Sequence, residues 1–381
     1  MTVAGFTSTG SKRPDILFGA AAGMPQQMVR ANGCTVYATD GREYLDFIMA
    51  LGAVALGYGD TAVTAAAIDA VQRGTIGALA PEEESLLALD LNAIMPWLEQ
   101  VRFLKTGAEA VAAAVRIARV ATGRDFVLGC GYHGWLDWCS TAGGVPALTQ
   151  REFATIPFND CDRTRDAIHA AGTQLACVVI EPVIDGAPSL EWLSTLRAET
   201  AGIGALLIFD EVKTAFRLAL GGASEVWRIE PDLMVLGKAI ANGYPLAVVG
   251  GRAAVMDAIG RTWISSTMST EYVSLAAARA TIAAMRSRNV PGYLDVLGTR
   301  LFSGLQQLAA EYDSRGIHAV GIPQMCYLRY NDDALSQRVA AECARRGLLF
   351  KRTAYNFVSM AHTEQDVDRA LGILAEALAS C

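Results

Sequence analysis

The chain has 381 residues, of which 52% are hydrophobic and 19% charged, and its formal net charge is −7. That length exceeds one comfortable hydrophobic core, so we expect two or more lobes. The acidic balance and the lack of a basic run argue against nucleic acid or an anionic membrane as a partner. The apolar composition favours a buried subunit interface.

The termini, cysteines and histidines indicate the cellular setting. The first thirteen residues contain no apolar core of signal-peptide type, and no apolar stretch reaches transmembrane length without Gly or charge. The eight Cys are scattered without a CxxC pair, which favours free thiols in a reducing compartment. Free thiols of this kind predict a cytoplasmic location. The four isolated His have no zinc spacing, so we expect no metal.

Strand and helix patterns alternate along most of the chain. Residues 33–46 predict a hairpin around an Asp40-Gly41 turn. Apolar periodicity then predicts helices at 61–73, 109–122 and 190–201, and buried strands at 101–104, 125–129, 175–180, 205–209, 233–236 and 246–250. This βαβ alternation predicts an α/β fold with a mostly parallel sheet covered by helices on both faces.

The pattern changes after a helix at 276–286. Short strands are predicted at 325–330, 348–351 and 357–360, and a helix at 364–378, which together indicate a smaller α+β lobe. The boundaries are therefore expected near residues 50 and 285, which gives segments 1–50, 51–285 and 286–381.

Two charged residues follow buried strands of the predicted sheet. Asp210 ends the run Leu206–Asp210, and Lys238 follows Gly237 after the strand at 233–236. Ligands of α/β sheets bind at this edge. A buried Lys can form a Schiff base, and a buried Asp can hold a protonated pyridine nitrogen, as pyridoxal phosphate (PLP) chemistry requires. The alternative interpretation is a solvated Lys and a helix-capping Asp.

Further motifs occur at neighbouring strand ends. Gly107 and Ala108 open a helix after Thr106, which suits a phosphate but also fits an ordinary capped turn. Tyr132 lies between glycines and could cover a planar ring or fill a core, and His133 beside it suits a structural hydrogen bond. Glu181 follows a predicted strand, where it could bind a ligand or form a salt bridge. Thr267 precedes a predicted helix, where it could bind a phosphate or cap the helix.

The joint order and spacing of these segments resemble the class III, fold-type-I PLP-dependent aminotransferases, most closely their glutamate-1-semialdehyde aminomutase-like branch. The resemblance covers about residues 25–375 and rests on segments 40–46, 101–110, 131–134, 180–182, 209–212, 237–245 and 359–363. It implies a large PLP-binding domain over 51–285, and a small α+β domain built from both chain ends, 1–50 and 286–381.

The resemblance also implies roles for the reacting end of the cofactor. Lys238 would form the Schiff base and carry a proton between the substrate Cα and the cofactor. Asp210 would pair with the pyridinium nitrogen, with Val212 beneath the ring and Tyr132 over its other face. Glu181 would lie near the ring hydroxyl or the substrate.

The remaining implied roles concern the phosphate and the partner subunit. Gly107 and Ala108 would donate backbone N–H groups to the phosphate, and His133 is placed among the cofactor-binding residues beside Tyr132. Thr267 would bind the phosphate of the partner subunit, which implies a homodimer with shared active sites.

Departures from the aminomutase branch bear on the reaction. By this resemblance, Ala354 takes the place of a glutamate of that enzyme, and Thr270-Glu271-Tyr272 takes the place of a Gly-Asn-Pro turn. No Arg is found at the N-terminal position that binds the substrate carboxylate in that enzyme. We therefore expect a ping-pong aminotransferase of specialised metabolism, which passes through pyridoxamine phosphate between an amino donor and a carbonyl acceptor. The alternatives are glutamate-1-semialdehyde 2,1-aminomutase, another isomerase or racemase, and an inactive binding relative.

Overall fold

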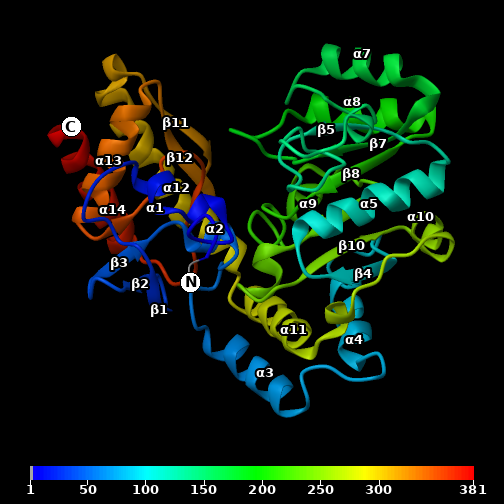
Figure 1. Cartoon of the computed structure of the whole chain (residues 1–381), viewed down its shortest axis with the longest axis horizontal. Helices are drawn as coiled ribbons and strands as arrows, with labels where there is room; N and C mark the ends of the chain where they lie inside the picture. The colour runs from blue at the N-terminus through cyan, green and yellow to red at the C-terminus, as the bar shows by residue number, and fades with distance from the viewer. Residues whose placement is uncertain (1–2) are drawn as a thin grey trace. The chain divides into compact units, whose positions relative to one another are not determined.

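The computed structural model describes residues 3–381, which form two compact units (Figure 1). Unit 1 combines the chain up to Asp60 with Asn289–Cys381, and unit 2 is Thr61–Arg288. Unit 1 is therefore assembled from both ends of the chain, and unit 2 is continuous.

Unit 2 contains a seven-stranded sheet in the order β4-β10-β9-β8-β7-β5-β6. Its strands are β4 (Gln100–Leu104), β5 (Phe126–Cys130), β6 (Phe153–Thr155), β7 (Leu175–Ile180), β8 (Leu206–Asp210), β9 (Leu233–Leu236) and β10 (Ala247–Gly251). The five strands from β9 to β6 are parallel, whereas β10 runs antiparallel to both β4 and β9. The prediction of an α/β fold with a mostly parallel sheet is confirmed.

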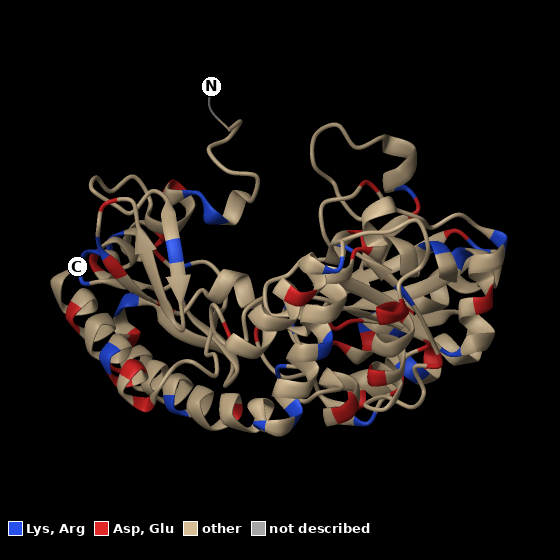
Figure 2. Cartoon of the chain, turned by 90° about the horizontal axis from the view of Figure 1, so that it is seen from below, with Lys and Arg blue, Asp and Glu red and all other residues tan. Residues whose placement is uncertain are grey.

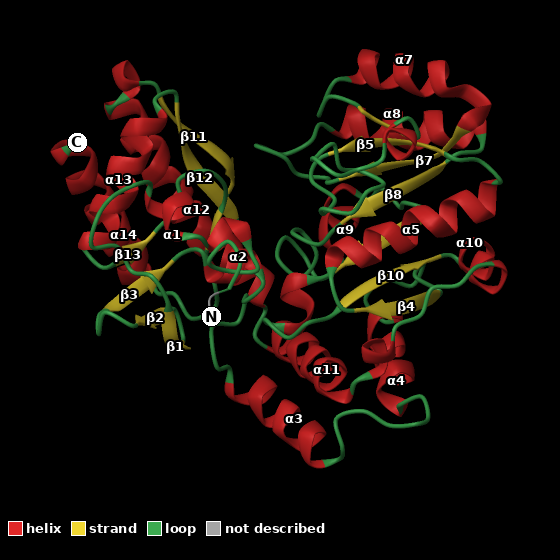
Figure 3. Cartoon of the chain, in the orientation of Figure 1, coloured by secondary structure: helices red, strands yellow, loops and turns green. Residues whose placement is uncertain are grey.

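Helices cover both faces of this sheet (Figure 3). The helices of unit 2 are α3 (Thr61–Gln72), α4 (Glu82–Asn92), α5 (Gly107–Thr122), α6 (Ala147–Gln150), α7 (Cys161–Ala171), α8 (Leu190–Ile203), α9 (Gly222–Trp227), α10 (Ala253–Met256) and α11 (Tyr272–Ser287). Alternate residues of the strands face opposite sides, so one core packs against α5 and the other against α7 and α8. All six residues of β7 are buried, as expected for a central parallel strand.

Unit 1 contains two small sheets. One has the order β1-β2-β3-β13, and the other β11-β12-β14. The strands are β1 (Met28–Asn32), β2 (Thr35–Ala38), β3 (Glu43–Asp46), β11 (Ile317–Ile322), β12 (Met325–Tyr330), β13 (Leu348–Leu349) and β14 (Asn356–Phe357). The helices are α1 (Pro14–Phe18), α2 (Met49–Gly52), α12 (Val290–Glu311), α13 (Asp333–Arg345) and α14 (Glu364–Ser380).

The two strands predicted near the C-terminus are shorter than expected. The prediction of 348–351 and 357–360 is corrected to β13 and β14, each only two residues long. The reason is Asn356, whose Oδ1 accepts a hydrogen bond from the Lys351 backbone at 2.6 Å, so that this N–H is not available to a sheet. Side-chain bonds of this kind compete with strand pairing.

A buried histidine ties the C-terminal segment to β3 within unit 1. The Nδ1 atom of His362 accepts the Ser359 backbone N–H at 3.0 Å and lies 2.8 Å from the Ser359 hydroxyl. Its Nε2 atom lies 3.0 Å from the Asp46 carbonyl oxygen, to which it donates. These bonds give residues 359–363 a structural function, because they join segments from opposite ends of the chain.

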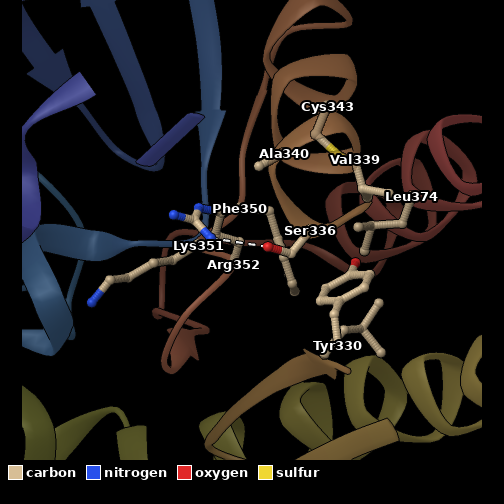
Figure 4. A pocket seen from close by; sticks show the side chains of 10 residues that line it. Tyr330, Ser336, Val339, Ala340, Cys343, Phe350, Lys351, Arg352 and Leu374 are labelled. Carbon is tan, nitrogen blue, oxygen red and sulfur yellow. Dashed lines mark hydrogen bonds between the residues drawn. The ribbon is translucent and has the colours of Figure 1, made fainter. Parts of the chain in front are cut away.

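A small cavity in unit 1 is lined mainly by apolar side chains (Figure 4). Its volume is about 10 Å³, which is enough for about one water molecule and too little for a substrate. Burial raises the pKa of the Tyr330 hydroxyl at its edge. Arg352 donates to the Ser336 hydroxyl at 2.9 Å beside it. The cavity is a packing defect of unit 1 and offers no room for chemistry.

Charged side chains of both signs are interspersed over the helices of each unit (Figure 2). Within the described part of the chain, no helix is both long enough and apolar enough to cross a membrane.

Candidate active site

Three charged residues meet at one edge of the unit 2 sheet. Glu181 follows β7 directly, Asp210 is the last residue of β8, and Lys238 follows β9 after Gly237. The strands are adjacent and parallel, with Ile180 opposite Phe209 and Asp210 opposite Val235. The side chains therefore emerge at the carboxyl ends of neighbouring strands, which is where such sheets bind ligands.

Lys238 occupies an unusual backbone position. It opens a 3₁₀-helix (Lys238–Ala241) with a φ of 47°, a left-handed conformation that side chains other than Gly rarely adopt. Burial lowers the pKa of its amine to about 8, and the positive charges of Lys213 and Arg217 act in the same direction. Roughly one amine in ten is then neutral at pH 7, so Lys238 is suited to nucleophilic attack on a carbonyl group.

Asp210 is buried and paired with a histidine. Its Oδ2 atom lies 2.9 Å from Nδ1 of His133, and its Oδ1 atom accepts the Val212 backbone N–H at 3.2 Å. Because a carboxylate only accepts, Nδ1 of His133 carries the proton. The Nε2 atom of His133 is buried and has no hydrogen-bond partner among residues 3–381. The pair fixes the orientation of Asp210.

Glu181 is held from two sides. Its Oε2 atom accepts the Tyr132 backbone N–H at 2.9 Å, and its Oε1 atom forms an ion pair with Lys213 at 2.8 Å. Gly131 has a φ of 115°, and a Cβ there would come within 2.7 Å of Glu181. The alternative interpretation of Glu181 as a salt-bridging residue therefore describes its contacts, although it lies at the ligand-binding edge of the sheet.

The N-terminus of α5 can receive an anion. Thr106 caps this helix, and its hydroxyl and backbone form a reciprocal capping box with Glu109. Among the described residues, none accepts a hydrogen bond from the backbone N–H groups of Gly107 and Ala108. These two groups and the helix dipole favour a phosphate. The structure shows the capped turn at Thr106, and this cap leaves the N–H groups of Gly107 and Ala108 available, so phosphate binding is compatible with it.

Two glycines expose an apolar surface on Val212. A Cβ at Gly107 would approach a methyl group of Val212 to 3.2 Å, and one at Gly237 would approach it to 3.3 Å. The side chain of Val212 thus lies between these two backbone segments, beside Asp210 in the chain. A flat ring can pack on this surface because neither glycine adds a side chain to it.

The segment Gly131–Gly134 lies against the start of α5. Gly134 has a φ of 104°, and a Cβ there would come within 2.5 Å of Ala108 Cβ. Tyr132 in this turn is 70% exposed, so its ring is available to cover a ligand. Thr267 is also exposed and opens a 3₁₀-helix (Thr267–Thr270), but no hydrogen bond of the described residues joins it to Lys238 or Asp210.

Three further charged residues lie in this region and were not assigned a role from the sequence. Glu211 is fully buried and accepts the backbone N–H groups of Ala223 and Ser224, each at 2.8 Å, so it fixes the start of α9. Lys213 pairs with Glu181, and Arg217 is fully buried, which lowers the pKa of its guanidinium to about 10. The available signal was the dense run of charges after the apolar strand β8.

The whole chain matches known proteins. A family model described as aminotransferase class III matches residues 19–378. The chain belongs to the class III aminotransferase family. A glutamate-1-semialdehyde 2,1-aminomutase of Thermomicrobium roseum is 35% identical to this class III member, with 98% of this chain and 95% of that protein covered. The aminomutase-like branch indicated by the sequence is thereby confirmed.

Solved structures extend the comparison. The FumI protein of Sphingopyxis sp. MTA144, solved in a PLP form, is 28% identical with a TM-score of 0.92, and covers 99% of this chain and 93% of its own. An omega-transaminase from Sphaerobacter thermophilus is 26% identical with a TM-score of 0.89, and covers 99% and 94%. Both confirm the fold-type-I architecture, and PLP is the cofactor of this family.

The residues at the sheet edge fit PLP. The free N–H groups of Gly107 and Ala108 suit its phosphate, and the apolar surface of Val212 between two glycines suits its ring. Asp210 is buried and anchored, as a partner of the pyridine nitrogen has to be, and Lys238 supplies an amine of lowered pKa. All of these residues belong to unit 2.

Proposed function

We propose that this class III enzyme is an aminotransferase, which moves an amino group from a donor to a separate carbonyl acceptor by a ping-pong cycle. The observation that carries the amino-group chemistry, common to both candidate reactions, is the arrangement of Lys238 beside Asp210 at adjacent strand ends, with the pKa of the Lys238 amine lowered to about 8. The likeness to the omega-transaminase supports transfer between two molecules.

Residues of unit 2 would bind the cofactor and move the protons of the reaction. PLP, when bound, supplies an electron sink for a carbanion at the substrate Cα. Lys238 contributes its amine as the covalent attachment point and moves the proton at the substrate Cα. Asp210 holds a proton on the pyridine nitrogen, and His133 keeps Asp210 in place through the Nδ1 hydrogen bond. Gly107 and Ala108 bind the phosphate.

Tyr132 and Val212 would enclose the ring. Val212, in the turn after β8, would pack against one face, and the exposed ring of Tyr132 would cover the other. Together they would exclude water from the site, which would strengthen the interaction of Asp210 with the pyridine nitrogen. Glu181 lies near the ring hydroxyl or the substrate, with Lys213 balancing its charge.

The second candidate is glutamate-1-semialdehyde 2,1-aminomutase, an isomerase in which the amino group returns to the same carbon skeleton. The names of the curated relatives favour this candidate over transfer, because the one at 35% identity is such an enzyme. Against it stands Ala354, which the resemblance to the aminomutase branch places where that enzyme has a glutamate. A missing charge-assisted contact costs about 1.5–3 kcal/mol, or roughly one to two orders of magnitude in specificity.

Two measurements on the purified protein separate the candidates. The first follows 5-aminolevulinate formation from glutamate-1-semialdehyde, for which the aminotransferase proposal expects no efficient turnover. Turnover of about 1–10 per second would instead establish the aminomutase. In the second, the pyridoxamine form of the protein carries an isotopically labelled amino nitrogen and is mixed with a panel of aldehydes and ketones. Mass spectrometry then detects the labelled amine. Appearance of the label in a released product supports transfer.

We also propose a homodimer in which Thr267 binds the phosphate in the partner subunit's site. Large apolar side chains of unit 2 remain exposed in a single chain, among them Leu79 at 84%, Trp263 at 80% and Met268 at 55%. Thr267 is exposed between the last two, which supports a contact with a second copy. A cytoplasmic location is proposed from the scattered cysteines alone.

A further inference from the structure

Lys213 is a charged residue of the sheet edge whose role is not accounted for by binding of the cofactor's phosphate or ring. It lies in the turn after β8, three residues beyond Asp210, and its ammonium group pairs with Glu181 after the adjacent strand β7 at 2.8 Å. Both side chains are largely buried, at 15% and 8% exposure. Lys238 follows β9, on the other side of β8.

A buried ion pair needs an explanation beyond folding. Removing two charges from water costs free energy that their mutual attraction often fails to recover, so an apolar pair of similar size is frequently as stable. Stability alone therefore does not explain the charge on Lys213, and its electrostatic effect on neighbouring groups can. The side chain of Val212, which precedes Lys213, lies against Gly237, which precedes Lys238, so the two lysines leave contacting segments of neighbouring strand ends. Among the charged groups around Lys238, Lys213 has the largest effect on its amine.

We propose that Lys213 is a positioning residue for Lys238: it supplies a second positive charge beside the reacting amine and withholds the negative charge of Glu181 from it, so that Lys238 stays uncharged often enough to react. This inference rests on the proposed role of Lys238 as the reacting amine. It assigns Lys213 no contact with the substrate.

Four charged groups act on Lys238 in addition to burial. Lys213 and Arg217 lower the pKa of its amine, whereas Glu181 and Asp210 raise it. Asp210 is engaged by His133, and Glu181 is engaged by Lys213. Loss of the charge on Lys213 would therefore act twice, by removing a cation and by leaving Glu181 unpaired. Both changes raise the pKa of Lys238.

The test measures the pKa of Lys238 in the full-length protein freed of cofactor. Trace acetylation over a pH series is quantified by mass spectrometry on the peptide that contains Lys238, with the peptide of the exposed Lys12 as internal reference. Lys213→Met should raise the pKa of Lys238 by about one unit or more. Lys213→Arg keeps the charge and should leave the pKa closer to the wild-type value.

A second substitution, at Glu181, is expected to shift the pKa of Lys238 in the opposite direction, so the test does not depend on the folding of Lys213→Met alone. Glu181→Gln keeps the Tyr132 hydrogen bond but removes the negative charge, so the pKa of Lys238 should fall. The double variant Lys213→Met with Glu181→Gln should lie between the two single variants. A purely structural role for Lys213 predicts no such pattern of opposite signs.

The outcomes are distinct from those of the proposed function. An unchanged or lower pKa of Lys238 in Lys213→Met overturns the inference. If that variant fails to fold, an unchanged or higher pKa in Glu181→Gln overturns it. Failure of the proposed role of Lys238 as the reacting amine is detected separately, because PLP and borohydride would then leave no adduct on Lys238 of the wild-type protein.

Discussion

At the scale of the residue, the site depends on how Lys238 is held. A left-handed backbone at a residue with a side chain is strained, and such strain persists only where the surrounding structure enforces it. The strand β9 and the helical turn after it do so here. The amine is thereby kept near Asp210, and burial makes it a better nucleophile than a surface lysine.

Asp210→Asn should leave cofactor binding largely intact but slow turnover by roughly a hundred- to a thousand-fold. An amide can still accept the hydrogen bond from His133, whereas it cannot keep the pyridine nitrogen protonated. The measurement is kcat with saturating PLP, beside a PLP titration of the same variant. Near-normal turnover would show that Asp210 serves only to anchor the turn after β8.

The sequence predicted those parts of the site that have local signals. Lys238, Asp210 and Glu181 each interrupt an apolar run abruptly, so their positions at strand ends followed from the sequence. The ion pair between Lys213 and Glu181 did not, because it joins residues from two strands. Nor did the bond between His133 and Asp210, which lie 77 positions apart. Such contacts depend on the order of the strands in the sheet, which the hydrophobic periodicity of the sequence does not determine.

At the scale of the element, the start of α5 and the Gly131–Gly134 turn form one unit. The helix would supply the proposed phosphate donors, and the turn carries Tyr132 and His133. Their close approach requires glycine at position 134, where the backbone is left-handed and Ala108 leaves no room for a Cβ. Helices α3, α5 and α8 and the central strands were predicted closely because their patterns are strong, whereas helix α12 was not predicted. The two-residue strands of unit 1 depend on side-chain bonds such as that of Asn356.

Gly134→Ala should weaken PLP binding by roughly ten- to a hundred-fold, since a strained backbone costs about 1–3 kcal/mol and the turn would move away from α5. Titration of the cofactor-free protein with PLP measures the dissociation constant. Gly143→Ala is the matched control, because a Cβ there meets nothing within 4 Å. Equal affinities of the two variants would contradict the proposed phosphate site at the start of α5 beside the Gly131–Gly134 turn.

At the scale of the whole molecule, the proposal is a dimer that shares its sites. Exposed apolar side chains of unit 2 would become buried between two copies, and Thr267 would reach the partner's cofactor. The aminomutase and omega-transaminase likenesses each extend over at least 98% of this chain, so both units take part in the comparison.

Mixing Lys238→Ala subunits with Thr267→Ala subunits tests the shared site. Each homodimer should be impaired, whereas a heterodimer would contain one site with both residues intact and regain activity. Activity of the mixture after subunit exchange is compared with the mean of the separate variants, and sedimentation reports the oligomeric state. A fully active monomer would contradict the shared-site proposal.

The central claim is that Lys238 carries the cofactor, and borohydride reduction tests it most directly. The protein loaded with PLP is reduced, digested and analysed by mass spectrometry, beside Lys238→Ala treated in the same way. We predict one reduced adduct, on the peptide that contains Lys238, and its loss together with all turnover in the variant. An adduct on Lys105 or Lys351 instead, or turnover that survives in Lys238→Ala, would contradict the account.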